Sequence, residues 1–183
     1  MNVLIISGHP DLAQSVANKA ILDELTVLLP EAHIRKLDEL YYDRPINVVA
    51  EQEAILAADV LVWQFPFYWY SMPGLMKTWL DKVFLHGFAH GSTAKIAGKK
   101  LLLSITTGAP AEAYGEGAPM TRSIENFLMP FDGIVGLCKL KLLPTVYTNG
   151  VSYLFRSDEE GLRAQIAQAK EHAGRVANLI EAL

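Results

Sequence analysis

The sequence lacks the cysteine pairs, the basic excess and the long apolar runs that would each indicate a particular class of protein. Its one cysteine, Cys138, cannot form an intramolecular disulfide, and no CxxC pair is present for zinc or redox chemistry. The net charge of −4 argues against nucleic-acid binding, because no basic stripe is present to neutralise phosphates. No apolar run approaches the ~20 residues that span a bilayer, and the first residues lack the basic start of a signal peptide. We therefore expect a cytoplasmic protein that would meet a membrane only through a partner.

Strand-like and helix-like segments alternate along the 183 residues, which predicts parallel βαβ winding in a single domain over residues 1–183. Continuous apolar runs predict buried strands, and apolar residues at helical spacing predict the helices between them. The expected strands are 3–6, 33–37, 59–65, 100–106 and 139–146. The expected helices are 15–29, 48–58, one after Ser71 that runs to about 83, 120–129, and one near the C-terminus capped by Ser157.

Two strand orders are common for such a sheet, and the turn after the first strand separates them. The nicotinamide-binding order usually carries GxGxxG there, but this turn reads SGHPDLAQSVAN, and a Walker A loop is also absent from the sequence. We therefore predict a flavodoxin-like α/β fold, a doubly wound five-stranded parallel sheet of order 2-1-3-4-5 with helices on both faces. Its ligand crevice lies beyond the C-terminal ends of the first and third strands.

Two loops at that edge have unusual composition. The loop of residues 8–15 leads into a helix, and His9, Ser15 and Asn18 lie around the helix N-terminus, whose free N–H groups and dipole suit a phosphate. The alternative is that Ser15 only caps the helix. Residues 66–73, PFYWYSMP, gather four aromatic side chains where a strand end should face solvent. These side chains would hold a planar ring such as a flavin, or they would fill a dimer interface.

A third loop, TTGAP at residues 106–110, ends the fourth strand. Gly108 would let the backbone approach a ligand closely, and its N–H groups could bond the pyrimidine end of a flavin. Tyr114 follows closely enough to donate its hydroxyl to the ring. The alternative is an ordinary turn between a strand and a loop.

The motifs HPxxxxSxAN, QFPFYWYSMPGLMKTWLDKVF and TTGAP, in this order and spacing, resemble the NAD(P)H:quinone oxidoreductase family of flavodoxin-like enzymes over residues 1 to about 147. The segments PAEAY and MPFDGIVGLCKLKLLP resemble a branch of that family, the ancillary flavoprotein subunits of glutathione-regulated potassium-efflux systems. The resemblance implies two-electron hydride transfer from NAD(P)H through a bound flavin to a quinone or similar small molecule. It also implies a homodimer.

The same resemblance leaves two questions open. It implies FMN or FAD, and we expect FMN because the chain lacks the long C-terminal extension of the FAD-using relatives. It also implies an alternative function, in which the protein is a regulatory subunit that activates a potassium-efflux transporter at the inner membrane. The flavin would then have a structural or sensing role.

Carried over position by position, the resemblance assigns flavin contacts to three groups of residues. These are His9, Ser15, Val16, Ala17 and Asn18 for the phosphate, Phe67, Tyr68, Trp69 and Tyr70 for the ring face and edge, and Thr106, Thr107, Gly108 and Ala109 for a second ring edge. The family's tyrosine near the flavin matches Tyr114, which we expect to be catalytic by stabilising charge on the reduced ring.

The sequence departs from the family pattern at two points. Ala109 stands where many members have a second glycine, and the stretch GEGAPM after Tyr114 lacks the histidine that assists the hydride step in better-known quinone reductases. The resemblance therefore predicts flavin binding more firmly than turnover.

Several other residues are expected to have no catalytic role. His86 and His90 have i, i+4 spacing, but the glycines beside them disfavour a helix and no carboxylate motif accompanies them, so we predict no metal site. Cys138 is expected to be a small core residue, because no histidine partner is evident. Trp79 and Asp81 are expected to be structural. A group of acidic residues is expected to form a solvated face: Asp38, Glu39, Asp43, Glu51 and Glu53.

Overall fold

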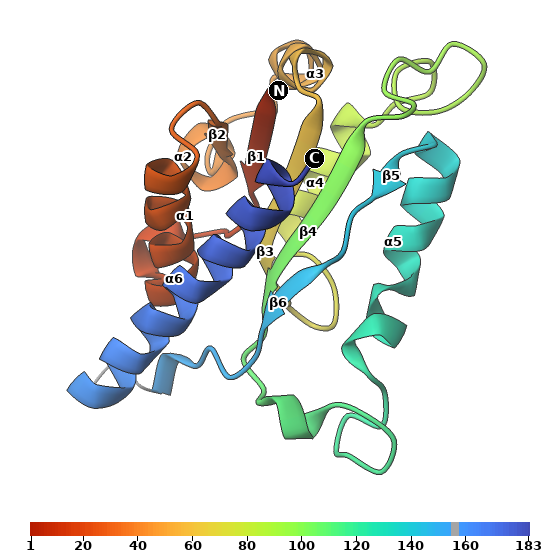
Figure 1. Ribbon diagram of the computed structural model, residues 1–183. Coiled ribbons are helices and arrows are strands. Elements are labelled where there is room, and N and C mark those ends of the chain that lie inside the picture. Colours follow the sequence, from red (N-terminus) through yellow and green to blue (C-terminus); the bar gives the residue numbers. More distant parts are fainter. Residues whose placement is uncertain (155–157) are drawn as a thin grey trace.

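The computed structural model describes residues 1–154 and 158–183, so the predicted helix cap Ser157 lies outside the described residues. Its sheet is parallel throughout, with the order β2-β1-β3-β4-β5 and a sixth strand, β6, that also pairs with β4 (Figure 1). The predicted flavodoxin-like order is confirmed. The strands are β1 Val3–Ser7, β2 His33–Lys36, β3 Val60–Pro66, β4 Lys100–Thr106, β5 Lys141–Leu142 and β6 Val146–Thr148.

Helices cover both faces of this sheet. They are α1 Val16–Leu28, α2 Leu37–Tyr41, α3 Val48–Ala57, α4 Gly74–Val83, α5 Ile124–Cys138 and α6 Glu159–Glu181, with short 3-10 turns at Leu12–Gln14 and Ala111–Ala113. The apolar side chains of α1 and α6 pack on one face, and those of α2 to α5 pack on the other. In Figure 1 the long helix α6 crosses in front of the sheet and α4 lies behind it. No helix of the described ranges is long and apolar enough to cross a bilayer.

The face of the sheet under α1 and α6 changes from apolar to polar side chains toward the C-terminal ends of the strands. Val60 and Val62 of β3 belong to the apolar core on that face, whereas Leu61 and Trp63 belong to the opposite core, as the period of two requires. Farther along, four buried polar residues continue the α1 and α6 face, none more than 2% exposed: Ser7, Gln64, Ser104 and Thr106. The C-terminal edge of the sheet is therefore built to meet polar partners.

Two predicted elements have different bounds in the structure. The expected fifth strand is split into β5 and β6, because Pro144 lies between them and has no N–H to donate to a ladder. Helix α5 continues for nine residues beyond Met129, with Pro130 inside it. Pro130 is exposed, and the buried side chains of Phe131 and Cys138 hold the helix to the core beyond it. The short helix α2 was not expected, and it begins at Leu37, the residue at which the second strand was expected to end.

The expectation that Glu51 belongs to a solvated face is wrong. Glu51 is fully buried on α3, where its carboxylate accepts hydrogen bonds from Arg35 Nε at 2.7 Å and from Trp79 Nε1 at 2.9 Å. The Tyr41 hydroxyl donates to the same carboxylate. A buried carboxylate is tolerated when cations and donors satisfy it, and these three side chains come from β2, α4 and α2. Trp79, expected to be structural, is fully buried.

Candidate functional site

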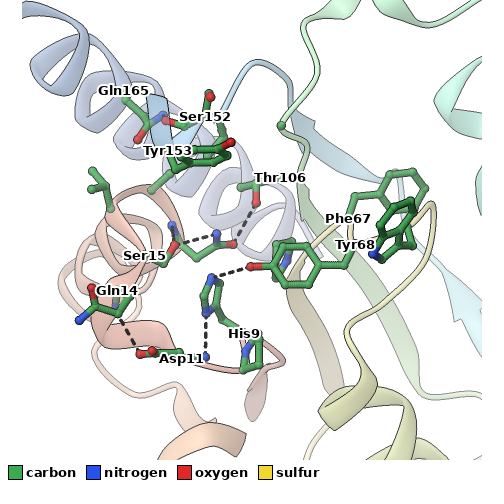
Figure 2. Close-up of a pocket in the computed structure, with 18 residues that line it drawn as sticks. His9, Asp11, Gln14, Ser15, Phe67, Tyr68, Thr106, Ser152, Tyr153 and Gln165 are labelled. Atoms are coloured by element: carbon green, nitrogen blue, oxygen red, sulfur yellow. Dashed lines mark hydrogen bonds between the residues drawn. The ribbon is translucent and has the colours of Figure 1, made fainter. Parts of the chain in front are cut away.

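A cavity of about 440 Å³ opens at the C-terminal edge of the sheet, where the fold predicts a ligand crevice. Its walls come from the loop after β1, the start of α1, the loop after β3, the end of β4 and the segment after β6 (Figure 2). Sites for small molecules usually have volumes on the order of 300–1,000 Å³. The cavity is therefore large enough for a cofactor-sized ligand.

The start of α1 forms one wall. Ser15 is the N-cap of this helix, and its Oγ accepts the N–H of Asn18 at 3.2 Å. Val16 and Ala17 line the cavity in the first turn, where backbone N–H groups have no intrahelical acceptor. No acidic side chain lies in that first turn. These features suit an anionic group such as a phosphate.

A buried hydrogen-bond network lies at the base of this wall. Asn18 Nδ2 donates to Ser15 Oγ at 3.0 Å, and Asn18 Oδ1 accepts from Gln64 Nε2 at 2.7 Å and from Thr106 Oγ1 at 3.0 Å. Asn18, Gln64 and Thr106 are at most 3% exposed, so the two bonds that join them are shielded from water. Through one amide the network ties α1 to β3 and β4, and so holds the walls that these elements carry.

His9 and Tyr68 meet at the same side of the cavity. The Asp11 backbone N–H donates to His9 Nδ1 at 3.1 Å, so a neutral imidazole carries its proton on Nε2. That nitrogen lies 3.5 Å from the Tyr68 hydroxyl, and the two rings are 6.1 Å apart in an edge-to-face arrangement. His9 is 7% exposed, and both residues line the cavity. They place hydrogen-bonding groups near the start of α1.

The aromatic loop after β3 has an unusual backbone. The Ser71 N–H donates to Tyr68 O at 3.0 Å, and the two central residues of this turn, Trp69 and Tyr70, have positive φ values of 49° and 64°. Glycine or asparagine usually occupies such positions, and a bulky residue there costs about 1–3 kcal/mol. Trp69 is 93% exposed at the cavity rim, and Tyr70 stacks on Phe127 of α5, with ring centres 4.7 Å apart. Strain of this kind is typical of functional sites.

The segment after β6 forms a wall that the sequence did not predict. Val151, Ser152 and Tyr153, which we call the β6 wall, line the cavity together with Gln165 of α6. Gln165 Nε2 donates to Ser152 O at 3.0 Å, and Figure 2 shows both residues beside Tyr153. A signal for this wall was available, because the residue after any parallel strand lies at the same edge of the sheet. No local pattern marked Gln165.

A family model described as the flavodoxin-like fold matches residues 1–173 of this chain. The chain belongs to this family. It is 40% identical over 170 residues to the glutathione-regulated potassium-efflux system ancillary protein KefF of Enterobacter sp. (strain 638), covering 92% of this chain and 93% of that protein. The predicted resemblance to the flavodoxin-like quinone reductases and to these ancillary subunits is confirmed.

Two solved structures of the same fold extend the comparison. General stress protein 14 from Treponema denticola, in complex with FMN, is 31% identical with a TM-score of 0.87, and the match covers 98% of this chain and 99% of that one. An NADPH-quinone reductase from P. pentosaceus is 27% identical with a TM-score of 0.74, and the match covers 94% and 98%. The family therefore includes relatives that bind FMN and relatives named as quinone reductases.

The cavity brings together most of the residues that the sequence singled out. Those that line it are His9, Ser15, Val16, Ala17, Asn18, Phe67, Tyr68, Trp69, Thr106 and Gly108. Four others do not line it: Tyr70, Thr107, Ala109 and Tyr114. Tyr70 faces α5, and Thr107 is buried with its hydroxyl 2.9 Å from Ala109 O and from Asn149 Oδ1. Ala109 is half-buried, and Tyr114 is half-buried with its ring centre 6.4 Å from that of Phe127. The sequence also missed Pro10, Asp11 and Gln14 at the rim.

The residues expected to have no catalytic role lie away from this cavity. The rings of His86 and His90 are 5.5 Å apart, and residues 1–154 and 158–183 hold no group of three or more His, Cys, Asp or Glu that could bind a metal ion. Cys138 is buried, and burial raises the pKa of its thiol, which disfavours the reactive thiolate.

Proposed function

We propose that this chain binds FMN and transfers a hydride from NAD(P)H, through the flavin, to a quinone or a similar small acceptor. The observation that carries the proposal is the pairing of two features in one cavity: a helix N-terminus suited to a phosphate, and exposed aromatic side chains suited to a planar ring. The FMN complex of a relative and the quinone reductase activity named for another support it. FAD is the alternative flavin.

In this proposal each wall holds one part of the flavin. His9 and residues 15–18 bind the phosphate, the loop of residues 67–70 covers the ring, and residues 106–109 offer backbone groups to the ring edge. The flavin, when bound, supplies the chemistry of accepting and donating a hydride. The protein orients the two substrates in turn and keeps water from the ring, which removes much of the entropic barrier to transfer.

Two side chains would supply hydrogen bonds during the reaction. The Nε2–H of neutral His9 would donate to a phosphate oxygen, because the Asp11 N–H already occupies Nδ1. The Tyr114 hydroxyl would stabilise negative charge on the reduced ring. Since Tyr114 does not line the cavity, its role is best tested by Tyr114→Phe, for which we expect slower turnover with unchanged FMN affinity.

The test is a spectrum followed by an assay. The purified protein should be yellow, and mass spectrometry of the released pigment should identify FMN. NADPH and NADH should then be consumed on addition of a soluble benzoquinone or naphthoquinone. Protein that binds neither FMN nor FAD would overturn the proposal, and flavin-loaded protein without turnover across several quinones would restrict it to flavin binding.

A second function is favoured by one specific observation, the 40% identity to a potassium-efflux ancillary protein. In that role the protein would bind a transporter at the inner membrane and activate it from the cytoplasm, as a homodimer. Co-purification with a glutathione-gated potassium transporter of the same organism would support this role. Potassium efflux that does not change when the gene for this chain is deleted would contradict it.

A further inference from the structure

A fully buried histidine joins three elements behind the cavity. His172 of α6 is 0% exposed; its Nε2 lies 2.7 Å from Ser104 Oγ on β4, and its Nδ1 lies 2.9 Å from Thr148 Oγ1 on β6. Arg175, one turn later on α6, donates through Nη2 to Thr148 Oγ1 at 2.8 Å and to Tyr147 O at 3.0 Å. Both ring nitrogens of His172 therefore have a hydroxyl partner, and each partner belongs to a different strand.

The imidazole of His172 is neutral. Burial, and secondarily the positive charge of Arg175, lower its pKa from 6.5 to about 3. A neutral imidazole has one donor and one acceptor nitrogen, and each hydroxyl can serve as the complementary partner. A polar ring in this position is less favourable than a leucine unless it is fully hydrogen-bonded. Its two bonds link Ser104 with Thr148, which is a contact that an apolar side chain would not provide.

Thr148 is the last residue of β6, a short strand with few backbone hydrogen bonds to the rest of the sheet. β6 lies at the edge of the sheet, and among the residues that the structure describes it pairs with β4 alone, over three residues. Immediately after it, the Val151 N–H donates to Thr107 O at 2.8 Å and the Gly150 N–H donates to Ala109 O at 2.9 Å. The Thr107 N–H donates to Thr148 O at 2.9 Å. The β6 wall is therefore held by a few backbone hydrogen bonds that follow Thr148, the last residue of β6. Thr148 is also the residue that His172 contacts.

We propose that His172 is a positioning residue that fixes Thr148 against Ser104 and thereby sets the place of the β6 wall relative to the loop after β4. The inference rests on the proposed function, since the wall matters for catalysis only if the cavity holds a flavin. His172 itself does not line the cavity, so it acts through Thr148 and the residues that follow. Loss of the link should weaken FMN binding without removing any contact to the flavin.

The test compares two substitutions of His172 with a control on the same helix. His172→Leu removes both hydrogen bonds, whereas His172→Gln keeps one donor and one acceptor. Val176→Ala is the control: Val176 lies one turn away on α6, is also fully buried, and belongs to the apolar core on that face of the sheet. FMN affinity is measured by quenching of flavin fluorescence on the apoprotein, and stability by thermal unfolding. We expect His172→Leu to raise the FMN Kd by about tenfold, a typical loss for a supporting hydrogen bond at a site.

The other two variants separate positioning from stability. His172→Gln should stay near the wild-type Kd, and Val176→Ala should lower Tm without changing the Kd. A folded His172→Leu protein with wild-type FMN affinity would overturn the inference, as would a Val176→Ala protein whose affinity falls to the same extent. If His172→Leu does not fold, Thr148→Val, which removes the hydroxyl that both His172 and Arg175 contact, should show the same loss of affinity.

A measurement without flavin distinguishes this inference from the proposed function. In His172→Leu, the amide hydrogens of Gly150 and Val151 should exchange faster with solvent than in the wild type, and in Val176→Ala they should not. Wild-type protein that binds no flavin would overturn the proposed function. The amide exchange of Gly150 and Val151 would still show whether His172 fixes the position of the β6 wall. Unchanged exchange at both amides would overturn the positioning role even in a protein that binds FMN.

Discussion

At the scale of single residues, His172 should shape the acid stability of the protein. Its pKa is about 3 in the folded chain and near 6.5 when unfolded, so between these values only the unfolded chain takes up the proton. Its contribution is therefore constant above pH 7, and the free energy of unfolding falls as the pH drops from 6.5 toward 3. His172→Gln should reduce the loss between pH 7 and pH 4.5 by about 2 kcal/mol, at up to ~1.4 kcal/mol per pH unit.

Urea unfolding at several pH values measures this difference. His33→Gln, a substitution of an exposed histidine on β2, is the matched control. The charged group that acts on His172 is Arg175. A His172→Gln protein with the same slope as the wild type would contradict this account, because it would mean that the folded and unfolded chains protonate His172 over the same pH range.

Gly8, at the start of the loop after β1, lies so close to Met76 of α4 that a larger side chain would not fit. A Cβ atom added there would lie 2.9 Å from Met76 Cβ on α4, which is shorter than real contacts allow. Gly8→Ala should therefore destabilise the fold by about 1–3 kcal/mol, as overpacking usually does, and should disturb the loop that carries His9. Chemical denaturation measures the loss.

Gly108 is the control for that prediction, because it also lies beside the cavity but has room for a methyl group. Its added Cβ would meet only Val151 O at 3.8 Å, an ordinary contact. Gly108→Ala should unfold like the wild type and weaken FMN binding only if the flavin approaches this backbone. Equal destabilisation by both substitutions would contradict the explanation given for Gly8.

At the scale of elements, the carboxylate of Glu51 holds β2, α2, α3 and α4 together. Glu51→Gln keeps the volume but removes the charge, and leaves the Arg35 guanidinium, 15% exposed, without its counterion. Breaking a buried ion pair on one side costs about 3–5 kcal/mol. Glu53→Gln on the same helix is exposed and should change stability by less than about 0.5 kcal/mol. Similar unfolding curves for the two variants would contradict this account.

The elements also show why some of the fold and the site could be predicted and the rest could not. β1, β3 and β4 consist mostly of apolar residues and β3 ends at a proline, so their order and the ligand edge follow from the sequence. Glu51 could not be predicted, because an acidic residue beside other acidic residues looks the same whether or not Arg35 and Trp79 reach it. The extent of α5 depends on tertiary packing of Phe131 and Cys138, which outweighs the local effect of Pro130.

The residues of the candidate site also separate into those that could be predicted from the sequence and those that could not. Loops directly after strands could be assigned because parallel topology brings them to one edge, which placed His9, Tyr68 and Thr106 in one cavity. The β6 wall was missed because the split at Pro144 moved the end of the last strand two residues beyond the predicted one. His172 was missed because a histidine within an amphipathic helix gives no local sign of its partners on β4 and β6.

At the scale of the whole molecule, the proposed cofactor should be linked to folding. A ligand that binds only the folded chain raises stability by an amount set by its concentration relative to the Kd, ~2.7 kcal/mol at a hundredfold excess. We expect FMN to raise the Tm of the apoprotein progressively with concentration, and riboflavin, which lacks the phosphate, to raise it less. Equal shifts for FMN and riboflavin would contradict a phosphate site at the start of α1.

The split last strand has a consequence for behaviour in concentrated solution. A long exposed edge strand has unpaired backbone N–H and C=O groups, which can pair with the same strand of another copy and lead to aggregation. Here one rim is cut by Pro144 into pieces of two and three residues, and the other is a four-residue strand that carries Arg35 and Lys36. Neither edge strand is long and flat, so edge-to-edge pairing between copies of the chain is disfavoured during synthesis and refolding.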